Sequence, residues 1–196
     1  MPFVPQPNTA GATVWEGVVL AGGHSRRMGT EKALLTVAGE PLWRRQARVL
    51  REAGAAEIRL SVRREQAWAS ASGERLVHDA VEDAGPLGGI VAAARAMRGT
   101  HLGVLAVDLP RMEPAWWRTL AENCRPGRGA VGKCEGFFEP LAAIYPREIL
   151  AAAEAALKAG EWSLQRLLAA EAARFACVEI GVAEAAWFEN WNAPRR

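Results

Sequence analysis

The sequence predicts an α/β fold in which helices cover both faces of a mostly parallel central sheet. Short apolar or β-branched runs alternate along the chain with longer amphipathic or alanine-rich segments, the pattern of strands joined by helical crossovers. One run, at 102–107, is continuously apolar, as expected of a strand buried on both faces. Half of the 196 residues are apolar, which is enough to bury a sizeable core. We expect a disordered lead at 1–12 and a single domain at 13–196.

The first half of the chain predicts three strands and two helices. Residues 15–20 are a short apolar run, and 41–53 place apolar residues among arginines at helical spacing. Residues 57–62 and 75–78 are the next strands, because each is a short apolar run that ends in charged or turn-forming residues. A helix at 90–97 follows the turn-rich segment EDAGPLGG.

The second half of the chain continues the alternation. It predicts a strand at 102–107, a helix from Pro114, strands at 130–133 and 141–145, an alanine-rich helix at 147–159, a helix from Ser163, a strand near 175–180 and an irregular tail at 188–196. Proline suits the first turn of a helix, where its missing N–H is not needed, and alanine has the highest helix propensity. Because the run at 102–107 is apolar throughout, we expect it in the middle of the sheet.

Charge and composition exclude several classes of function. The net charge of +2 is too small for a nucleic-acid or membrane-surface protein. Each apolar run is interrupted well before the roughly 20 residues that a bilayer helix needs, and the start of the chain lacks the pattern of a secretion signal, so we expect a cytoplasmic protein. The three cysteines show no C-x-x-C spacing and the three histidines are scattered, which argues against a zinc site or a disulfide.

Function is expected in the loops that follow strands, because ligands of parallel sheets bind beyond the carboxyl ends of the strands. The first such loop, LAGGHSRRMGTEKALL at 20–35, resembles a cradle for a polyphosphate. Its glycines and cations are Gly22, Gly23, Gly29, Arg26, Arg27 and Lys32. Glycines let backbone N–H groups turn toward phosphate oxygens, and the cations supply charge. Neither G-x-x-x-x-G-K-[ST] nor G-x-G-x-x-G is present. The competing interpretation is a glycine-rich turn with solvated basic residues.

Two further loops carry unusual residues. Asp108 directly follows the apolar strand and precedes Pro110, so its carboxylate at the mouth of the sheet could hold Mg²⁺ against bound phosphates. Capping of the following segment is the alternative role. In AGPLGGI, Pro86 fixes the chain, and Gly88 and Gly89 remove side chains where a helix begins. That would admit a ribose or base, although tight packing of the helix explains the glycines equally well.

Together these motifs resemble a known family. LAGGHSRRMGTEKALL, HDAVEDAGPLGGI, AVDLPRM, EPLAAIYPREIL, AGEWSLQRLL and FENWNAP are similar, in order and across nearly the whole chain, to the molybdenum cofactor guanylyltransferase (MobA) family. The resemblance implies a Rossmann-like three-layer α/β/α nucleotidyltransferase fold. It also implies transfer of GMP from Mg-GTP to molybdenum-bearing molybdopterin, with release of pyrophosphate. Related branches use CTP or sugar phosphates.

The resemblance assigns roles to individual residues. Nucleotide binding falls to Leu20, Ala21, Gly22, Gly23, Lys32, Asp79, Pro86, Leu87, Gly88 and Asp108. Catalysis falls to Arg27, Lys32 and Asp108, with Asp108 also the magnesium ligand. Asn190 and Asn192 resemble the asparagine pair on the acceptor side, and Trp191 between them could stack on a pterin. Expected partners are GTP and molybdopterin, with no nucleic acid and no membrane, and transient contact with other cofactor-biosynthesis proteins or molybdoenzyme chaperones.

Alternatives remain open at this level. Arginines cluster at 44–51 and at 63–64 and could face an anionic pterin phosphate, but solvated arginines on an exposed helix face are more common. The same fold could use CTP with molybdopterin, or another nucleotide with a sugar or polyol phosphate. A non-catalytic nucleotide-binding module fits less well, because such a module does not need a metal-binding carboxylate opposite a phosphate loop.

Overall fold

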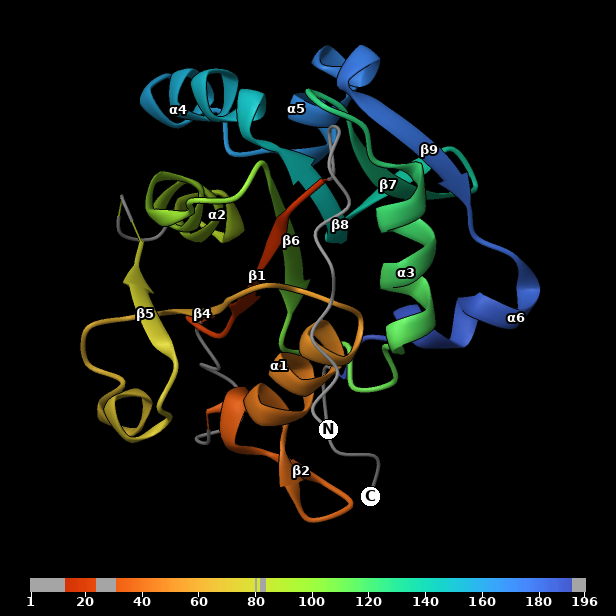
Figure 1. The fold of residues 1–196 in the computed structure, drawn as a ribbon. Coiled ribbons are helices and arrows are strands. Elements are labelled where there is room, and N and C mark those ends of the chain that lie inside the picture. Colours follow the sequence, from red (N-terminus) through yellow and green to blue (C-terminus); the bar gives the residue numbers. More distant parts are fainter. Residues whose placement is uncertain (1–12, 24–30, 80, 82–83, 192–196) are drawn as a thin grey trace, which may run out of the picture.

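A seven-stranded sheet forms the centre of the computed structural model, which describes residues 13–23, 31–79, 81 and 84–191 (Figure 1). The strands of the sheet are β1 (Trp15–Leu20), β4 (Ile58–Val62), β5 (Arg75–His78), β6 (His101–Ala106), β7 (Gly129–Cys134), β8 (Phe137–Pro146) and β9 (Phe175–Glu179). Their order is β5-β4-β1-β6-β8-β7-β9. The disordered lead expected at 1–12 lies outside the described residues.

The sheet is mostly parallel, as predicted. Strands β5, β4, β1 and β6 are parallel neighbours, and β7 and β9 form a further parallel pair. Only β8 runs the other way, antiparallel to both β6 and β7. The apolar strand β6 lies mid-sheet between β1 and β8, with every residue buried, which confirms its predicted position.

Helices cover both faces of the sheet. They are α1 (Leu42–Glu52), α2 (Pro86–Ala96), α3 (Pro114–Asn123), α4 (Leu150–Lys158), α5 (Leu164–Ala170) and the short α6 (Val182–Ala185). The apolar sides of α1 and α3 share one core with the sheet, and α2, α4 and α5 share the other (Figure 1). The predicted three-layer α/β/α architecture is therefore present. No described helix is long and apolar enough to cross a bilayer.

Several short elements differ from the prediction. Helix α2 begins at Pro86 rather than near residue 90, because burial of Gly88 and Gly89 against neighbouring atoms offsets their low helix propensity. The predicted helix at 147–159 is a 3₁₀ turn followed by α4. Unpredicted are the strands β2 (Thr36–Val37) and β3 (Glu40–Pro41), the 3₁₀ turns Lys32–Leu34, Ala67–Ala71, Ala172–Arg174 and Ala186–Phe188, and helix α6 in the tail.

The reversal of β8 arises at a two-residue turn. Strands β7 and β8 are joined through Glu135 and Gly136, whose φ angles are 49° and 87°. Positive φ at both central residues is the requirement of a type I′ hairpin turn, and glycine meets it without steric cost. The prediction of separate strands at 130–133 and 141–145 was correct in kind but missed that β8 extends back to Phe137.

Two stacked indoles fix one end of the central strands. The rings of Trp15 and Trp117 lie 5.9 Å apart at an interplanar angle of 11°. Gly103 of β6 lies beneath them, and a Cβ there would come within 2.7 Å of the Trp15 ring. A side chain at this position would therefore separate α3 from the sheet.

A buried ion pair ties β1 to β4. The Arg59 guanidinium donates to the Glu16 carboxylate, and each side chain is at most 5% exposed. Burial alone would raise the pKa of Glu16, but hydrogen bonds from the Gly99 amide, Arg59 and the Arg98 amide outweigh it and hold this pKa below its ordinary value of 4.5. Neither charge of such a pair can be left alone in the interior without a large desolvation cost.

We predict that Glu16→Ala lowers the free energy of unfolding by about 3 kcal/mol, because the buried Arg59 keeps only Glu57 as an acidic partner and the Arg98 and Gly99 amides lose their acceptor. Replacing both members, with Glu16→Met and Arg59→Leu, should restore much of the loss. Urea denaturation measures both changes. The control Glu154→Ala breaks an exposed pair with Arg95 and should change the free energy of unfolding little. If Glu16→Ala lowered the free energy of unfolding no more than this control does, the buried pair would have no structural role.

The pKa of Glu16 also predicts a pH dependence. Since the pKa in the folded state is lowered, the stabilisation is complete above the pKa of the unfolded chain and disappears as pH falls through the folded-state pKa. The difference in unfolding free energy between wild type and Glu16→Gln should therefore be largest near neutral pH and shrink in acid below pH 4.5. A difference in unfolding free energy that grows in acid would show that the pKa of Glu16 is not lowered in the folded state.

Candidate nucleotide site

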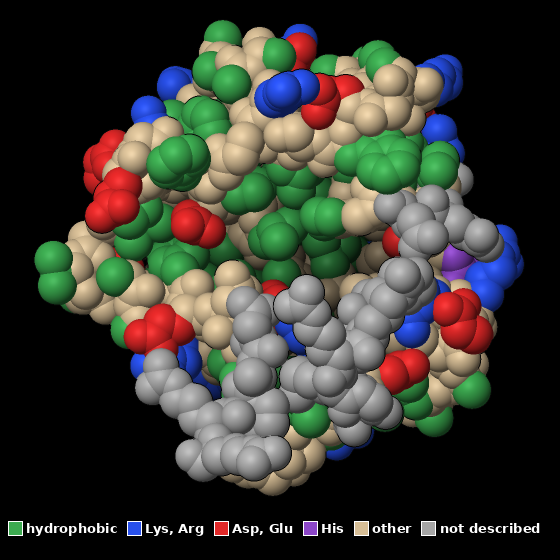
Figure 2. Space-filling view, turned by 180° about the vertical axis from the view of Figure 1, so that it is seen from behind, with side chains coloured by type: hydrophobic (Ala, Val, Ile, Leu, Met, Phe, Trp, Pro, Cys, Tyr) green, Lys and Arg blue, Asp and Glu red, His purple; other side chains and the backbone are tan. Residues whose placement is uncertain are grey.

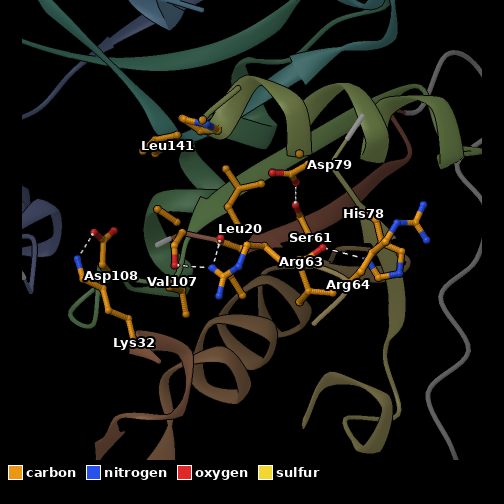
Figure 3. A pocket seen from close by; sticks show the side chains of 18 of the residues that line it. Leu20, Lys32, Ser61, Arg63, Arg64, His78, Asp79, Val107, Asp108 and Leu141 are labelled. Carbon is orange, nitrogen blue, oxygen red and sulfur yellow. Dashed lines mark hydrogen bonds and ion pairs between the residues drawn. The ribbon is translucent and has the colours of Figure 1, made fainter. Parts of the chain in front are cut away.

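A cavity of about 670 Å³ opens at the carboxyl ends of β1, β4, β5 and β6. Its wall combines the turn after β1, the segments that follow β4 and β6, and the start of α2 (Figure 3). The face seen in Figure 2 is hollowed at its middle, where apolar side chains gather. The position agrees with the rule that ligands of parallel sheets bind beyond the carboxyl ends of the strands.

A lysine and an aspartate meet on one side of this cavity. Strands β1 and β6 pair in register from Trp15 opposite His101 to Leu20 opposite Ala106, so the two chains leave the sheet at the same level. Asp108 follows β6, and Lys32 returns from the first loop so that its Nζ lies 3.3 Å from Asp108 Oδ2 (Figure 3). The two side chains are 25% and 24% exposed. The cation and carboxylate are thus partly shielded but open to a ligand.

An arginine holds the glycine turn. Arg63, immediately after β4, donates through Nη1 to the carbonyl of Gly22 at 2.6 Å and of Gly23 at 2.9 Å. Hydrogen bonds to a charged donor are stronger than neutral ones. Because both carbonyls are bound on the Arg63 side, the turn has a defined course at the cavity wall.

A buried glutamine connects this turn to the far end of the first loop. Gln66, 4% exposed, donates through Nε2 to the Ala21 carbonyl at 3.1 Å and to Glu31 at 2.9 Å, and its Oε1 accepts from the Arg63 amide at 2.7 Å. The Trp68 indole N–H also donates to Glu31. The residue before Lys32 is therefore held from two sides, which limits how far Lys32 can move.

The opposite wall contains Asp79 and the beginning of α2. Asp79 Oδ1 accepts a hydrogen bond of 3.0 Å from Ser61 Oγ. Gly85 and Pro86 open the helix at the cavity wall, and a Cβ on Gly89 would lie 2.3 Å from Ser61 Oγ and 3.2 Å from Asp79 Oδ1. Close packing therefore explains this glycine, and the Gly88 N–H donates to the Gly85 carbonyl at 3.2 Å at the start of the helix.

Eight of the predicted nucleotide residues line the cavity: Leu20, Ala21, Gly22, Gly23, Lys32, Asp79, Pro86 and Asp108. Two do not. Leu87 is fully buried in the core beside α2, and a Cβ on the buried Gly88 would lie 3.2 Å from the Val81 carbonyl oxygen, so neither offers a side chain or an open space to a ligand. Arg27 and Asn192 lie outside the described residues.

Further residues at the ends of β4 and β5 line the cavity, among them Ser61, Arg63, Arg64 and His78. The sequence offered Arg63 and Arg64 as contacts for an anionic pterin phosphate but favoured solvated side chains, and the structure places both at the cavity wall. Ser61 and His78 were missed, and the available signal was their place near strand ends at the same sheet edge as the glycine turn. By contrast, none of the four arginines of α1 lines either cavity. Arg45 pairs with Glu113, Arg48 with Glu40 and Glu52, and Arg51 with Glu74, whereas Arg44 lies over the Trp43 ring.

A second cavity, of about 290 Å³, adjoins the first and shares Ala106 and Leu141 with it. Asn190 lines this second cavity rather than the first. The next residue, Trp191, donates its backbone N–H to the Asp108 carbonyl at 2.8 Å, and its partly buried ring packs against the core of α1 and α3. The chain near residue 190 therefore lies beside the loop that carries Asp108.

The side chains at the cavity supply only some of the ligands that a divalent cation needs. Among the described residues there is no cluster of three or more His, Cys, Asp and Glu side chains that could enclose a metal. A single carboxylate beside a phosphate-binding turn is nevertheless the arrangement in which Mg²⁺ binds, since that ion is commonly held by one or two carboxylates together with substrate phosphates. Asp108, at the cavity wall, fits this role.

We predict that Gly89→Ala destabilises the protein by about 1–3 kcal/mol, because the new methyl group must displace the Ser61 hydroxyl. Adding Ser61→Ala should recover part of the loss, since the 2.3 Å clash is with Ser61 Oγ. Thermal unfolding of the two single variants and the double variant measures this coupling. If the stability losses of the two single variants simply added up in the double variant, the contact between position 89 and Ser61 would be contradicted.

Comparison with known proteins assigns the family. Residues 17–175 match the MobA-like NTP transferase domain. The chain is 45% identical, over 95% of its length and 94% of the relative's, to a probable molybdenum cofactor guanylyltransferase of Opitutus terrae. It is 35% identical to the molybdenum cofactor guanylyltransferase of a Pseudomonas putida strain, over 91% of this chain and 93% of that one.

The fold also has solved counterparts. The crystal structure of molybdopterin-guanine dinucleotide biosynthesis protein A from Archaeoglobus fulgidus matches with a TM-score of 0.73 at 24% identity, over 91% of this chain and 93% of that one. This likeness concerns the fold, whereas the two relatives share sequence over almost the whole chain. The resemblance inferred from the motifs is confirmed: the chain belongs to the MobA-like NTP transferase family, alongside the molybdenum cofactor guanylyltransferases.

Proposed function

We propose that this protein is a nucleotidyltransferase that transfers GMP from GTP to molybdopterin and releases pyrophosphate. The observation that carries the proposal is the meeting of Lys32, Asp108 and the Gly22–Gly23 turn on one cavity wall, in a chain whose curated relatives are named molybdenum cofactor guanylyltransferases. Its small-molecule partners would be GTP and molybdopterin, in the cytoplasm.

The chemistry explains why the cavity needs cations more than a nucleophilic side chain. A terminal phosphate of the acceptor is already an anionic nucleophile, so the barrier is the repulsion between two polyanions that meet at the α-phosphorus. Lys32 is placed to neutralise the phosphates of the leaving pyrophosphate, and the N–H groups of the turn add fixed dipoles. Arg27, in the same loop, would share this role.

Asp108 is the residue that would hold Mg²⁺, together with phosphate oxygens of the nucleotide. A bound Mg²⁺ withdraws charge from the phosphoryl oxygens and orients them. The Lys32 ammonium donates a hydrogen bond to the Asp108 carboxylate. Once that carboxylate is shared with a cation, the Lys32 ammonium is available to phosphate, so nucleotide and Mg²⁺ should bind cooperatively.

Recognition of the base must come from groups that the sheet does not already use. The Leu20 carbonyl accepts from the Val107 amide at 3.2 Å, and the Ala21 amide donates to the Ser61 carbonyl at 2.8 Å. This leaves the Gly22–Gly23 turn and the wall around Asp79 as the candidates for reading guanine. The alternatives, CTP with molybdopterin or another nucleotide with a sugar or polyol phosphate, differ at this wall.

The decisive experiment follows pyrophosphate release by the purified protein with Mg²⁺, molybdopterin and each of GTP, CTP, ATP and UTP. We expect release that depends on both GTP and molybdopterin. Release with CTP instead would assign the cytidylyl reaction. Absence of release with all four nucleotides would contradict the proposal and favour a different phosphorylated acceptor.

We predict that Asp108→Asn and Lys32→Ala each reduce turnover by about a hundredfold or more at saturating substrates, because each removes charge from the reacting phosphates. Lys158→Ala is the matched control, since this lysine ends α4 and lies outside both cavities. Steady-state kinetics at several Mg²⁺ concentrations measures the effect. Full turnover in either site variant would remove that residue from the mechanism.

Arg63→Ala should act differently. Loss of its hydrogen bonds to the Gly22 and Gly23 carbonyls frees the turn before nucleotide binds, so we expect the KM for GTP to rise by about tenfold or more. Arg118→Ala, on the surface of α3, is the control because Arg118 donates a hydrogen bond to the Glu52 carbonyl and lines neither cavity. An unchanged KM in Arg63→Ala would show that the turn keeps its shape without the guanidinium.

A further inference from the structure

The second cavity is built largely by the β7–β8 hairpin. Phe137, Phe138 and Glu139 of β8 form one side, and Gln165 and Asn190 contribute from α5 and the tail. Gln165 is held in place because its side chain bonds both backbone groups of Phe138, at 3.1 Å to the N–H and 2.7 Å to the carbonyl. The hairpin is therefore clamped to α5, and the cavity wall is preformed.

Glu139 stands out in this wall. It is half-buried, and among the described residues no hydrogen bond or ion pair engages its carboxylate. Burial raises the pKa of this carboxyl above its ordinary value of 4.5. A desolvated carboxylate without a partner is costly, and such groups are more often kept for a ligand than for the fold.

The backbone helps to aim this side chain. Between Ala130 and Gly132 of β7, the opposing residue on β8 jumps from Ile144 to Glu139, a break in the register. Such irregularities bend a strand and redirect side chains, and they are common next to active sites. Glu139 lies opposite Gly132, where the space that a Cβ would fill is occupied by Trp116 and Ile180.

The neighbouring aromatic residues suit a flat ring. Phe137 is 69% exposed and lines the second cavity, so its ring is open to a ligand there. The ring of Phe138 is covered on one side by the Lys133 ammonium, 5.7 Å from its centroid. An aromatic surface next to a carboxylate is the usual way to bind a planar heterocycle by stacking and edge recognition together.

We propose that Glu139 is a specificity-determining residue that binds the aminopyrimidinone edge of the acceptor's pterin ring in the second cavity. This inference rests on the proposed function. The 2-amino group and the adjacent ring N–H point the same way, so one carboxylate can accept both hydrogen bonds. Guanine has the same edge, but its candidate binding wall, around Asp79, lines the first cavity, whereas Glu139 lines the second. Glu139 is therefore assigned to the pterin.

The test compares wild type with Glu139→Gln, which keeps the shape and removes the charge. With GTP and molybdopterin as substrates, we expect the KM for molybdopterin to rise by about tenfold or more, while the KM for GTP stays within twofold. A rise in the KM for GTP alone would assign Glu139 to guanine and overturn the proposal. Glu135→Gln is the matched control, because Glu135 lies at the exposed turn of the same hairpin and outside the cavity.

A binding measurement separates ring recognition from turnover. Quenching of tryptophan fluorescence by free pterin and by lumazine, in which an oxo group replaces the 2-amino group, gives the two dissociation constants. Wild type should prefer pterin by about tenfold, and Glu139→Gln should lose this preference, because an amide can donate to the oxo group. Equal preference in wild type and variant would overturn the proposal, since a merely structural role would not change selectivity.

The two proposals fail in different ways. If wild type releases no pyrophosphate from GTP with molybdopterin, the proposed function is wrong. If that reaction proceeds but the Glu139→Gln variant keeps both its KM for molybdopterin and its preference for pterin, only the role of Glu139 is wrong. Thermal unfolding of the variant alongside wild type checks that the hairpin is still folded.

Discussion

The parallel pairing of β1 with β6 is the constraint on which the site depends. Six residue pairs in unbroken register bring the end of β1 and the end of β6 to one level, and the bond from the Val107 amide to the Leu20 carbonyl extends that match by one step. The glycine turn and the Asp108 loop therefore emerge side by side, although far apart in sequence. A shift of one residue would exchange the side chains that face the two cores, so the packing on both faces of the sheet keeps the site in place.

Much of the fold was accessible from the sequence because strong patterns coincide with strong physical requirements. The apolar run of β6, bounded by turn-forming residues, favours a strand buried on both faces, and the arginine-rich amphipathic pattern of α1 favours a helix with one face on a core. The start of α2 was missed because glycine propensity opposes a helix there, and only contacts with Ser61, Asp79 and Val81, which are distant in sequence, explain it. The direction of β8 was missed because it depends on two positive φ angles at Glu135 and Gly136 and on no apolar pattern.

The candidate site was predictable to the extent that it consists of backbone turns and charges directly after strands. Lys32, Asp79, Asp108 and the glycine turn satisfy that description. The supporting residues do not: Gln66 and Arg63 are ordinary polar residues in sequence, and their importance comes from hydrogen bonds across three separate segments. Leu87 shows the opposite case, since its place in a motif says nothing about its side chain, which packs in the core.

The stacked indoles of Trp15 and Trp117 have a practical consequence. Two parallel chromophores so close together couple their electronic transitions, so the native packing of the central sheet should leave a distinctive near-ultraviolet circular dichroism signal. These rings are buried and lie outside both cavities. Trp68 belongs to a second stacked pair, with Trp43 at 5.9 Å, and its indole N–H donates to Glu31 at the edge of the first loop. One pair thus reports on the packing of the central sheet, and the other on the surroundings of the first loop.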